Sequence, residues 1–203
     1  MANEHYFSAN PESDARPRQI SVTLAGRTIA LTTAAGVFSP SRLDAGTRVL
    51  LRTVPPTPPT GTFLDIGCGW GPLAITMALQ SPDADVWGVD VNERVLDLAR
   101  ANAATAGATN ITVKLPDDVP ADLVFTTIWS NPPIRVGKDE LHSILSRWIP
   151  RLAPGGDAWL VVSKNLGGDS LQRWLADTLA TGFHVTRATT DKGYRVIRVH
   201  RTA

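Results

Sequence analysis

The residues best suited to chemistry begin with a glycine-rich stretch at 64–72, in which Gly67, Gly69 and Gly71 alternate with other residues. Glycine lets the backbone turn tightly and lie against a ligand. The stretch follows an apolar run typical of a buried strand and precedes a helical pattern, and doubly wound sheets bind ligands at such strand ends. Asp90 ends the next predicted strand, where a carboxylate can accept hydrogen bonds from both ribose hydroxyls of an adenosine group. This pairing favours a nucleoside-binding loop over a purely structural turn.

The spacing of the glycines separates this loop from dinucleotide sites. The phosphate-binding pattern G-x-G-x-x-G is absent, since Pro72 follows Gly71, and the loop therefore suits a cofactor without a pyrophosphate. Asp65 either helps to hold the amino group of that cofactor or caps the loop, and the sequence leaves both readings open. Cys68 is expected to be a small packing residue of the loop, because no nearby histidine in the sequence would activate it as a nucleophile.

A second candidate site, Asn131-Pro132-Pro133, follows the predicted strand at 125–130. Proline cannot donate to a strand ladder, so pairing stops there, while the carbonyls and the Asn131 side-chain oxygen remain as acceptors. Together they can hold the two hydrogens of a planar amino group and aim its nitrogen at a sulfonium methyl, a reaction that proximity and orientation can accelerate. Because the motif comes two strands after Asp90, we prefer this chemistry to a simple Asn-Pro turn.

The elements that must position these residues alternate along the chain. This alternation predicts a Rossmann-like α/β fold with a mostly parallel sheet, helices on both faces and a C-terminal antiparallel hairpin at 185–189 and 194–199. Asn92 and Gly107 are expected to begin and end one helix, and Asp169 with Gln172 resembles a capping box for another. The predicted strands are 62–66, 86–89, 111–115, 125–130 and 158–162, and the predicted helices are 72–80, 92–106, 138–151 and 169–181, the third ended by 154–156.

Residues 1–54 are predicted to form an N-terminal appendage too short to be a separate domain. It would contain a β-hairpin at 21–25 and 28–32 around Gly26-Arg27, followed by a short helix capped by Asp44. The proline-rich segment 55–59 then serves as a stiff connector to the main domain, residues 60–203.

Composition narrows the class of protein. The 203 residues, 43% hydrophobic and 19% charged, suit one globular α/β domain. There is no apolar run of about 20 residues and no signal-peptide pattern, and a single cysteine fits a reducing compartment, so we expect a cytoplasmic protein without a membrane span. The four histidines lack metal-ligand spacing, so no metal is expected.

Net charge is +1, but residues 131–203 hold eleven Lys and Arg against six Asp and Glu. This mild bias fits either an RNA-facing patch or ordinary surface charge.

Taken together, the two sites resemble those of the class I S-adenosylmethionine-dependent methyltransferases, specifically the methyltransferase small domain family. That family includes ribosomal RNA guanine-N2 methyltransferases, and this sequence is most similar to small stand-alone members. The resemblance covers nearly the whole chain and rests mainly on segments 36–39, 44–47, 65–72, 90–93, 131–138 and 192–194.

The resemblance implies that S-adenosylmethionine is the cofactor. Gly67, Gly69 and Gly71 would cradle its amino-acid moiety, with Asp65 and Cys68 in the same loop. Asp90 would bind the ribose, Val91 would pack against the adenine, and Asp117 or Asp118 would receive the adenine amino group unless that segment is only a solvated turn. Asn131 and the carbonyl of Pro132, beside Pro133, would hold the target amine.

The segment after the second proline departs from the family pattern. Many amino-methylating relatives carry an aromatic residue there, whereas this chain has Ile134, which can pack on a base but cannot stack as an aromatic ring does. Phe38 would close the pocket, and Arg135 and Lys138 would either contact RNA phosphates or be plain surface charges.

These observations predict N2 methylation of a guanine in ribosomal RNA, with the target base flipped or already unpaired. One alternative is a methyltransferase that acts on another planar amine: adenine N6, a protein glutamine or a small molecule. The other is a non-catalytic, cofactor-binding protein associated with the ribosome. The sequence does not indicate an oligomeric state.

Overall fold

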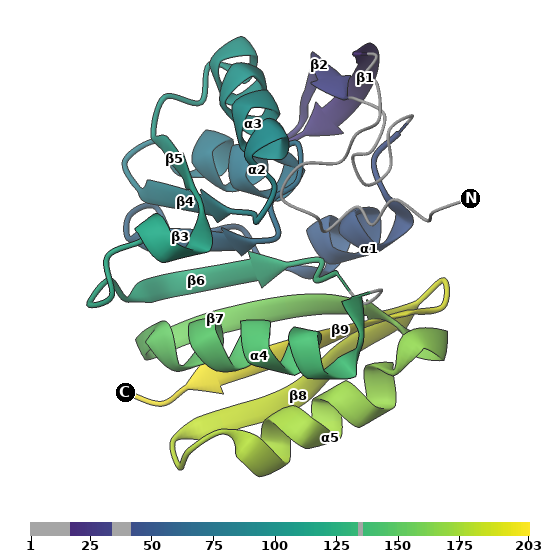
Figure 1. Cartoon of the computed structure of the whole chain (residues 1–203), viewed down its shortest axis with the longest axis vertical. Coiled ribbons are helices and arrows are strands. Elements are labelled where there is room, and N and C mark those ends of the chain that lie inside the picture. Colours follow the sequence, from purple (N-terminus) through teal and green to yellow (C-terminus); the bar gives the residue numbers. More distant parts are fainter. Residues whose placement is uncertain (1–16, 34–41, 134–135) are drawn as a thin grey trace.

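The computed structural model describes residues 17–33, 42–133 and 136–203. Its main sheet has seven strands in the order β5-β4-β3-β6-β7-β9-β8 (Figure 1). Strands β3 to β7 run parallel, and β9 pairs antiparallel with both β7 and β8. This arrangement confirms the predicted Rossmann-like sheet with a C-terminal antiparallel hairpin. The strands are β3 (Thr62–Ile66), β4 (Asp85–Val89), β5 (Ile111–Lys114), β6 (Phe125–Ser130), β7 (Leu152–Ser163), β8 (Phe183–Asp191) and β9 (Tyr194–Arg201).

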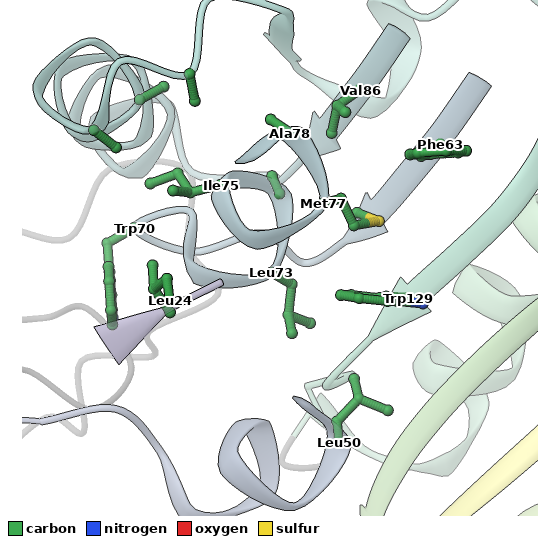
Figure 2. Close-up of a cluster of buried hydrophobic side chains, with 14 of the residues drawn as sticks. Leu24, Leu50, Phe63, Trp70, Leu73, Ile75, Met77, Ala78, Val86 and Trp129 are labelled. Carbon is green, nitrogen blue, oxygen red and sulfur yellow. The ribbon is translucent and has the colours of Figure 1, made fainter. Parts of the chain in front are cut away.

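Helices cover both faces of this sheet. Successive strand residues point to opposite faces, and the buried ones accordingly fall into two main apolar clusters. Phe63 and Trp129 pack with the helices α1, α2 and α3, as Figure 2 shows for part of that cluster, whereas Leu64 and Ile128 pack with α4 and α5. The helices are α1 (Ala45–Thr53), α2 (Pro72–Gln80), α3 (Glu93–Ala106), α4 (Lys138–Trp148) and α5 (Gly168–Thr178). None of the helices in the described ranges is long and apolar enough to cross a membrane.

The N-terminal hairpin consists of β1 (Arg18–Leu24) and β2 (Arg27–Thr33). Its turn is Ala25-Gly26, with φ of 47° and 75°, one residue earlier than predicted. The hairpin is attached to α3 by Asn102, whose side chain accepts from Thr32 N (2.8 Å) and donates to Thr32 O (2.8 Å) and Trp70 O (2.9 Å). Leu24 of β1 also belongs to the apolar cluster around α2. The N-terminal segment therefore packs directly on the elements that carry the glycine-rich loop.

Two local predictions are wrong. The segment 154–156 does not lie between α4 and the next strand, because β7 already begins at Leu152 and includes it. The pairing of β6 with β7 jumps from Phe125↔Leu152 to Thr127↔Asp157, and the extra residues form a bulge. A side chain on Gly156 would lie 2.8 Å from the Thr126 carbonyl oxygen, which explains a glycine there.

The expected capping box of α5 is not formed either. Gly167, with φ of 97°, precedes α5 without a side-chain cap. Asp169 and Gln172 instead contact the guanidinium of Arg195, whose side chain is only 5% exposed. A buried cation must be paired to offset its desolvation, and this need outweighs the local capping preference.

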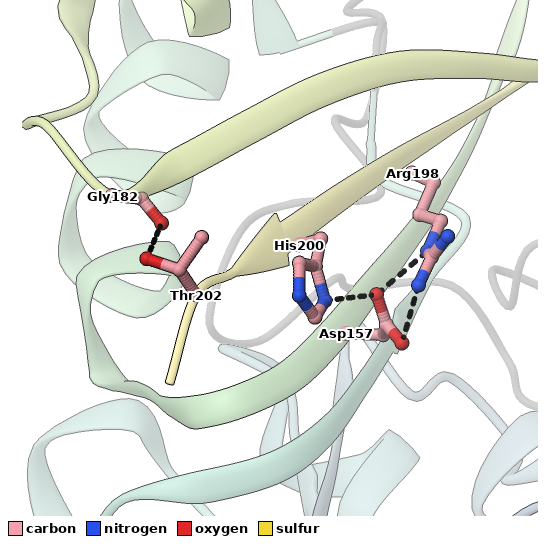
Figure 3. Close-up of polar contacts among 5 residues, drawn as sticks. All are labelled: Asp157, Gly182, Arg198, His200 and Thr202. Atoms are coloured by element: carbon pink, nitrogen blue, oxygen red, sulfur yellow. Dashed lines mark hydrogen bonds and ion pairs between the residues drawn. The ribbon is translucent and has the colours of Figure 1, made fainter.

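The end of β9 farthest from Tyr194 is held by polar contacts (Figure 3). Asp157 on β7 accepts two hydrogen bonds from Arg198 (2.7 and 3.0 Å) and contacts His200 Nδ1 (3.1 Å). These contacts fix β9 alongside β7, and at the other end of the same pair Tyr194 lies opposite Ser163. The register therefore places Tyr194 at the edge of the sheet where the parallel strands end.

Candidate active site

Three strand ends lie in one row across the sheet. Ile66, the last residue of β3, pairs with Val89 at the end of β4 and with Ser130 at the end of β6. Because the three strands are parallel, the residues that follow them, Gly67, Asp90 and Asn131, emerge at the same edge. A side chain built on Gly67 would be 3.7 Å from Pro133 Cδ, so the glycine-rich loop and the Asn-Pro-Pro segment are direct neighbours.

The glycine-rich loop is pinned against β4. The amides of Gly67 and Cys68 both donate to the carbonyl of Val89, at 2.8 and 3.0 Å. Gly67, Gly69 and Gly71 have φ of 70°, 55° and 96°, a region in which other residues are strained, so the loop requires glycine at these positions. The loop then leads into α2 at Pro72.

Asp90 joins this loop to the start of α3. Its Oδ2 accepts from Gly69 N (3.1 Å) and its Oδ1 from Asn92 N (3.1 Å), and the residue is 8% exposed. Burial raises the pKa of Asp90, while the backbone hydrogen bonds from Asn92, Gly69 and Val91 oppose that rise. The neighbouring Val91 is 44% exposed, although few large apolar side chains in the described ranges are. A carboxylate beside an uncovered apolar side chain suits a ribose and its attached base.

Asp65 is completely buried beneath the loop. Its Oδ2 accepts from Ala74 N (3.0 Å) in the first turn of α2, so it caps this helix from a neighbouring strand. Its Oδ1 has no hydrogen-bond partner among the described residues. Burial raises the pKa of Asp65 to about 8, and the charge of Asp90 contributes to this rise. Oδ2 thus performs the capping role that the sequence left open, and Oδ1 is available to a hydrogen-bond donor.

The raised pKa of Asp65 predicts a pH-dependent stability. The unfolded chain releases this proton near pH 4, whereas the folded chain keeps it up to about pH 8. The contribution of Asp65 to the free energy of unfolding is therefore fully present below about pH 4 and is lost as the pH rises to about 8. Between these values the free energy of unfolding falls by up to about 1.4 kcal/mol per pH unit. In urea unfolding at several pH values, Asp65→Asn should reduce the slope to what the raised pKa of Asp90 contributes, whereas Asp85→Asn, at the exposed start of β4, should keep the wild-type slope. Equal slopes in wild type and Asp65→Asn would contradict the assignment.

The side-chain amide of Asn131 has a defined orientation. Its Nδ2 donates to Oδ2 of Asp44, the N-cap residue of α1 (2.7 Å), and to the hydroxyl of Thr47 in the first turn of this helix (3.1 Å). A carboxylate only accepts hydrogen bonds, so the NH₂ group must face Asp44 and Oδ1 must face the other way. The sequence predicts Asp44 only as a helix cap, a role it also performs (Thr47 N to Oδ2, 3.0 Å), and indicates no role for Thr47. The segment 44–47 belonged to the family resemblance, but nothing in the sequence linked it to Asn131.

Other predicted residues lie elsewhere or perform simpler roles. Cys68 is buried with Sγ close to Gly88, and burial raises the pKa of its thiol, as expected of a packing residue. Asp117 is 90% exposed and pairs with Arg147 (2.6 Å) in the last turn of α4, so its expected contact with adenine gains no support. Within the described ranges, no three His, Cys, Asp or Glu side chains form a metal-binding group.

The substrate side of the site is only partly described. Pro132 is buried and Pro133 half-buried, with the carbonyl of Pro133 accepting from Val136 N (3.2 Å). Lys138 is exposed at the first residue of α4, and its contact with RNA stays a prediction. Phe38, Ile134 and Arg135 lie outside the described residues.

Comparisons with known proteins identify relatives of this chain. The model of the family "Methyltransferase small domain" matches residues 28–198. The chain is 31% identical to "Uncharacterized protein YbxB" of Bacillus subtilis (strain 168), covering 98% of this chain and 99% of that protein. It is 33% identical to "Ribosomal RNA small subunit methyltransferase C" of Pseudomonas syringae pv. tomato, covering 76% of this chain and 47% of that enzyme.

A solved structure shows the same fold. The Thermus thermophilus "16S rRNA N2 G1207 methyltransferase (RsmC) in complex with AdoMet and Guanosine" superposes with a TM-score of 0.78 at 23% identity, over 95% of this chain and 52% of that one. The chain thus spans about half the length of these ribosomal RNA enzymes. Since the family model covers most of the chain and the two motifs meet at one edge of the sheet, the chain belongs to the methyltransferase small domain family of S-adenosylmethionine-dependent methyltransferases.

Proposed function

We propose that this enzyme methylates the exocyclic N2 amine of a guanine in ribosomal RNA. The observation that carries the proposal is the meeting of Asp90 and Asn131 at one edge, with the Asn131 Oδ1 turned away from its own anchors. Relatives named as ribosomal RNA methyltransferases, and the related structure with guanosine, support guanine in such RNA as the target. An enzyme acting on ribosomal RNA would work in the cytoplasm.

The loop and its neighbours fit S-adenosylmethionine. Asp90 would accept hydrogen bonds from the ribose, and the exposed Val91 would be covered by the adenine. The glycine-rich loop would hold the amino-acid part, beneath which the unpartnered Oδ1 of Asp65 offers a buried acceptor. A donor brought to Oδ1 would favour the ionised form of Asp65 and so oppose the rise in its pKa that burial causes.

The residues around Asn131 would orient the target amine. Its Oδ1, with the carbonyl of Pro132, would accept the amine hydrogens, hold the nitrogen in line and return electron density to it. When bound, S-adenosylmethionine supplies an activated methyl group: the N–C bond forms as the C–S bond breaks, sulfur keeps the electron pair, and nitrogen releases a proton to solvent. The described residues thus contribute orientation and hydrogen-bond acceptors.

The substrate proposal predicts a particular product. The purified enzyme, incubated with labelled S-adenosylmethionine and with ribosomal subunits, naked ribosomal RNA, transfer RNA or protein extract, should yield N2-methylguanosine only in a ribosomal substrate lacking the modification. Nucleoside and peptide mass spectrometry would identify the product. N6-methyladenosine or methylglutamine would move the assignment to another planar amine, and tight cofactor binding without transfer would favour the non-catalytic alternative.

A further inference from the structure

We propose that the first turn of α1 is part of the active site, and that Asp44 and Thr47 are positioning residues that fix which end of the Asn131 amide faces the substrate. This inference rests on the proposed N-methyl transfer and deepens it. It assigns a role to a segment 84 to 87 residues away from Asn131 in the sequence.

The two ends of the Asn131 side chain are chemically opposite. Its Oδ1 can accept a hydrogen bond from an amine. Its NH₂ group can only donate, so it would repel the hydrogens of the amine and form no hydrogen bond with them. Rotating the amide by half a turn exchanges the two ends, so a useful site needs contacts that distinguish them. Asp44 Oδ2 at 2.7 Å and the Thr47 hydroxyl at 3.1 Å accept both amide hydrogens and leave Oδ1 for the substrate.

Gly46 provides a second, independent observation. A Cβ at this position would lie 2.9 Å from Asp44 Oδ2 and 3.3 Å from Asn131 Oδ1, so a methyl group would crowd both the anchoring carboxylate and the amide oxygen of Asn131. Gly46 has no left-handed backbone that would demand glycine. Within a helix, glycine costs about 0.5–1 kcal/mol relative to alanine. Glycine here keeps open the space in which the amide is held.

The helix that carries these residues is anchored firmly. Val49 and Leu50 of α1 are 1% and 0% exposed and share an apolar cluster with Leu73 and Trp129, two residues before Asn131 (Figure 2). From β9, the ring of Tyr194 approaches the same turn, with Cε1 3.1 Å from a Cβ placed on Gly46. The anchors of the amide are thus set by core packing and do not depend on a bound substrate.

The variants must separate positioning from helix capping. Serine is a good helix N-cap, so Asp44→Ser keeps a side-chain oxygen for the Thr47 amide but shortens the side chain away from Asn131. Thr47→Val removes the hydroxyl at nearly constant shape, and Thr47→Ser restores it. Thr53→Val, which removes a hydroxyl bonded to the Val49 carbonyl in the last turn of the same helix, is the matched control.

Single-turnover methyl transfer, cofactor titration and thermal melting should be measured for each variant. Asp44→Ser should lower the transfer rate about ten- to hundredfold, the range expected for a hydrogen bond to a charged group, with cofactor affinity unchanged. Thr47→Val should lower it less, Thr47→Ser should recover most of that loss, and Thr53→Val should match wild type. In the Asn131→Ala background, Asp44→Ser should cause no further loss, because the two act through one contact. An equal loss in both backgrounds, or a wild-type rate in folded Asp44→Ser, would overturn the proposal.

A measurement that needs no substrate separates the positioning role of Asp44 and Thr47 from the proposed guanine methylation. In NMR spectra of ¹⁵N-labelled protein, both hydrogens of the Asn131 side-chain NH₂, assigned by its absence in Asn131→Ala, should be protected from solvent exchange in wild type. Asp44→Ser should expose one of them, while Thr47 still accepts the other. Full protection of both hydrogens in Asp44→Ser, or of neither in wild type, refutes the positioning role. Normal protection with no guanine methylated would refute the proposed substrate alone.

Discussion

Asn131→Ala should reduce methyl transfer by at least about a hundredfold, the scale seen when one oriented hydrogen-bonding group at a reacting centre is removed. The variant loses the Oδ1 acceptor that would hold the target amine. It should nevertheless bind S-adenosylmethionine much as wild type does, because the cofactor loop is held by Val89 and Asp90. Single-turnover rates and calorimetric titration with the cofactor would measure the two effects separately.

A variant on the same strand controls for damage to the fold. Thr126 is exposed near the amino end of β6, opposite the end that carries Asn131, and its hydroxyl donates to the Thr62 carbonyl (3.2 Å). Thr126→Ala should retain both activity and cofactor affinity. Wild-type methylation by Asn131→Ala would remove the catalytic role that we assign to the Asn-Pro-Pro segment.

Asp90→Asn should weaken cofactor binding about ten- to hundredfold, as expected when a charged hydrogen-bond acceptor is lost. Both carboxylate oxygens accept from backbone amides, Oδ2 from Gly69 and Oδ1 from Asn92. An asparagine has one acceptor oxygen, so its NH₂ group would face one of these amides and loosen either the loop or the start of α3. The ribose would lose an acceptor as well. Calorimetry with S-adenosylmethionine and its demethylated product would report the change.

The matched control lies at the other end of the same strand. Asp85→Asn makes the same chemical change at the exposed start of β4 and should leave cofactor affinity unaltered. If Asp90→Asn bound the cofactor as tightly as wild type, Asp90 would be only a structural link between the loop and α3, and the ribose would have to be held elsewhere.

Local signals predicted most of the elements that carry the site. The structure has β3 and α2 with the bounds expected from sequence, and α3 begins after Asn92 and ends before Gly107 as predicted. These features depend on residues within a turn of one another: a capping side chain, a glycine in the left-handed region, a proline in the first helical turn. The sequence also predicts that Gly67, Asp90 and Asn131 lie in one row, because parallel strands end at a common edge of the sheet.

What the sequence could not show are contacts made across the fold. Asp44 carries a clear local signal as a helix cap, and that signal hides its second contact with Asn131. For Asp169, the local signal was overruled by the buried Arg195, a partner that only the packing of α5 against β9 reveals. The bulge at 154–156 likewise depends on how β7 meets β6. In each case a distant residue determines what a local pattern does.

Because the site is built on a common row of strand ends, its geometry depends more on the number of residues in each strand than on which apolar side chains the strands carry. Apolar residues inside β3, β4 or β6 can be exchanged for others of similar volume at modest cost. A single residue inserted into one of these strands would carry its terminal group about 3.3 Å further and onto the opposite face. The carboxylate proposed to hold the cofactor and the amide proposed to hold the target amine would then no longer face the same site, even in a protein that still folds.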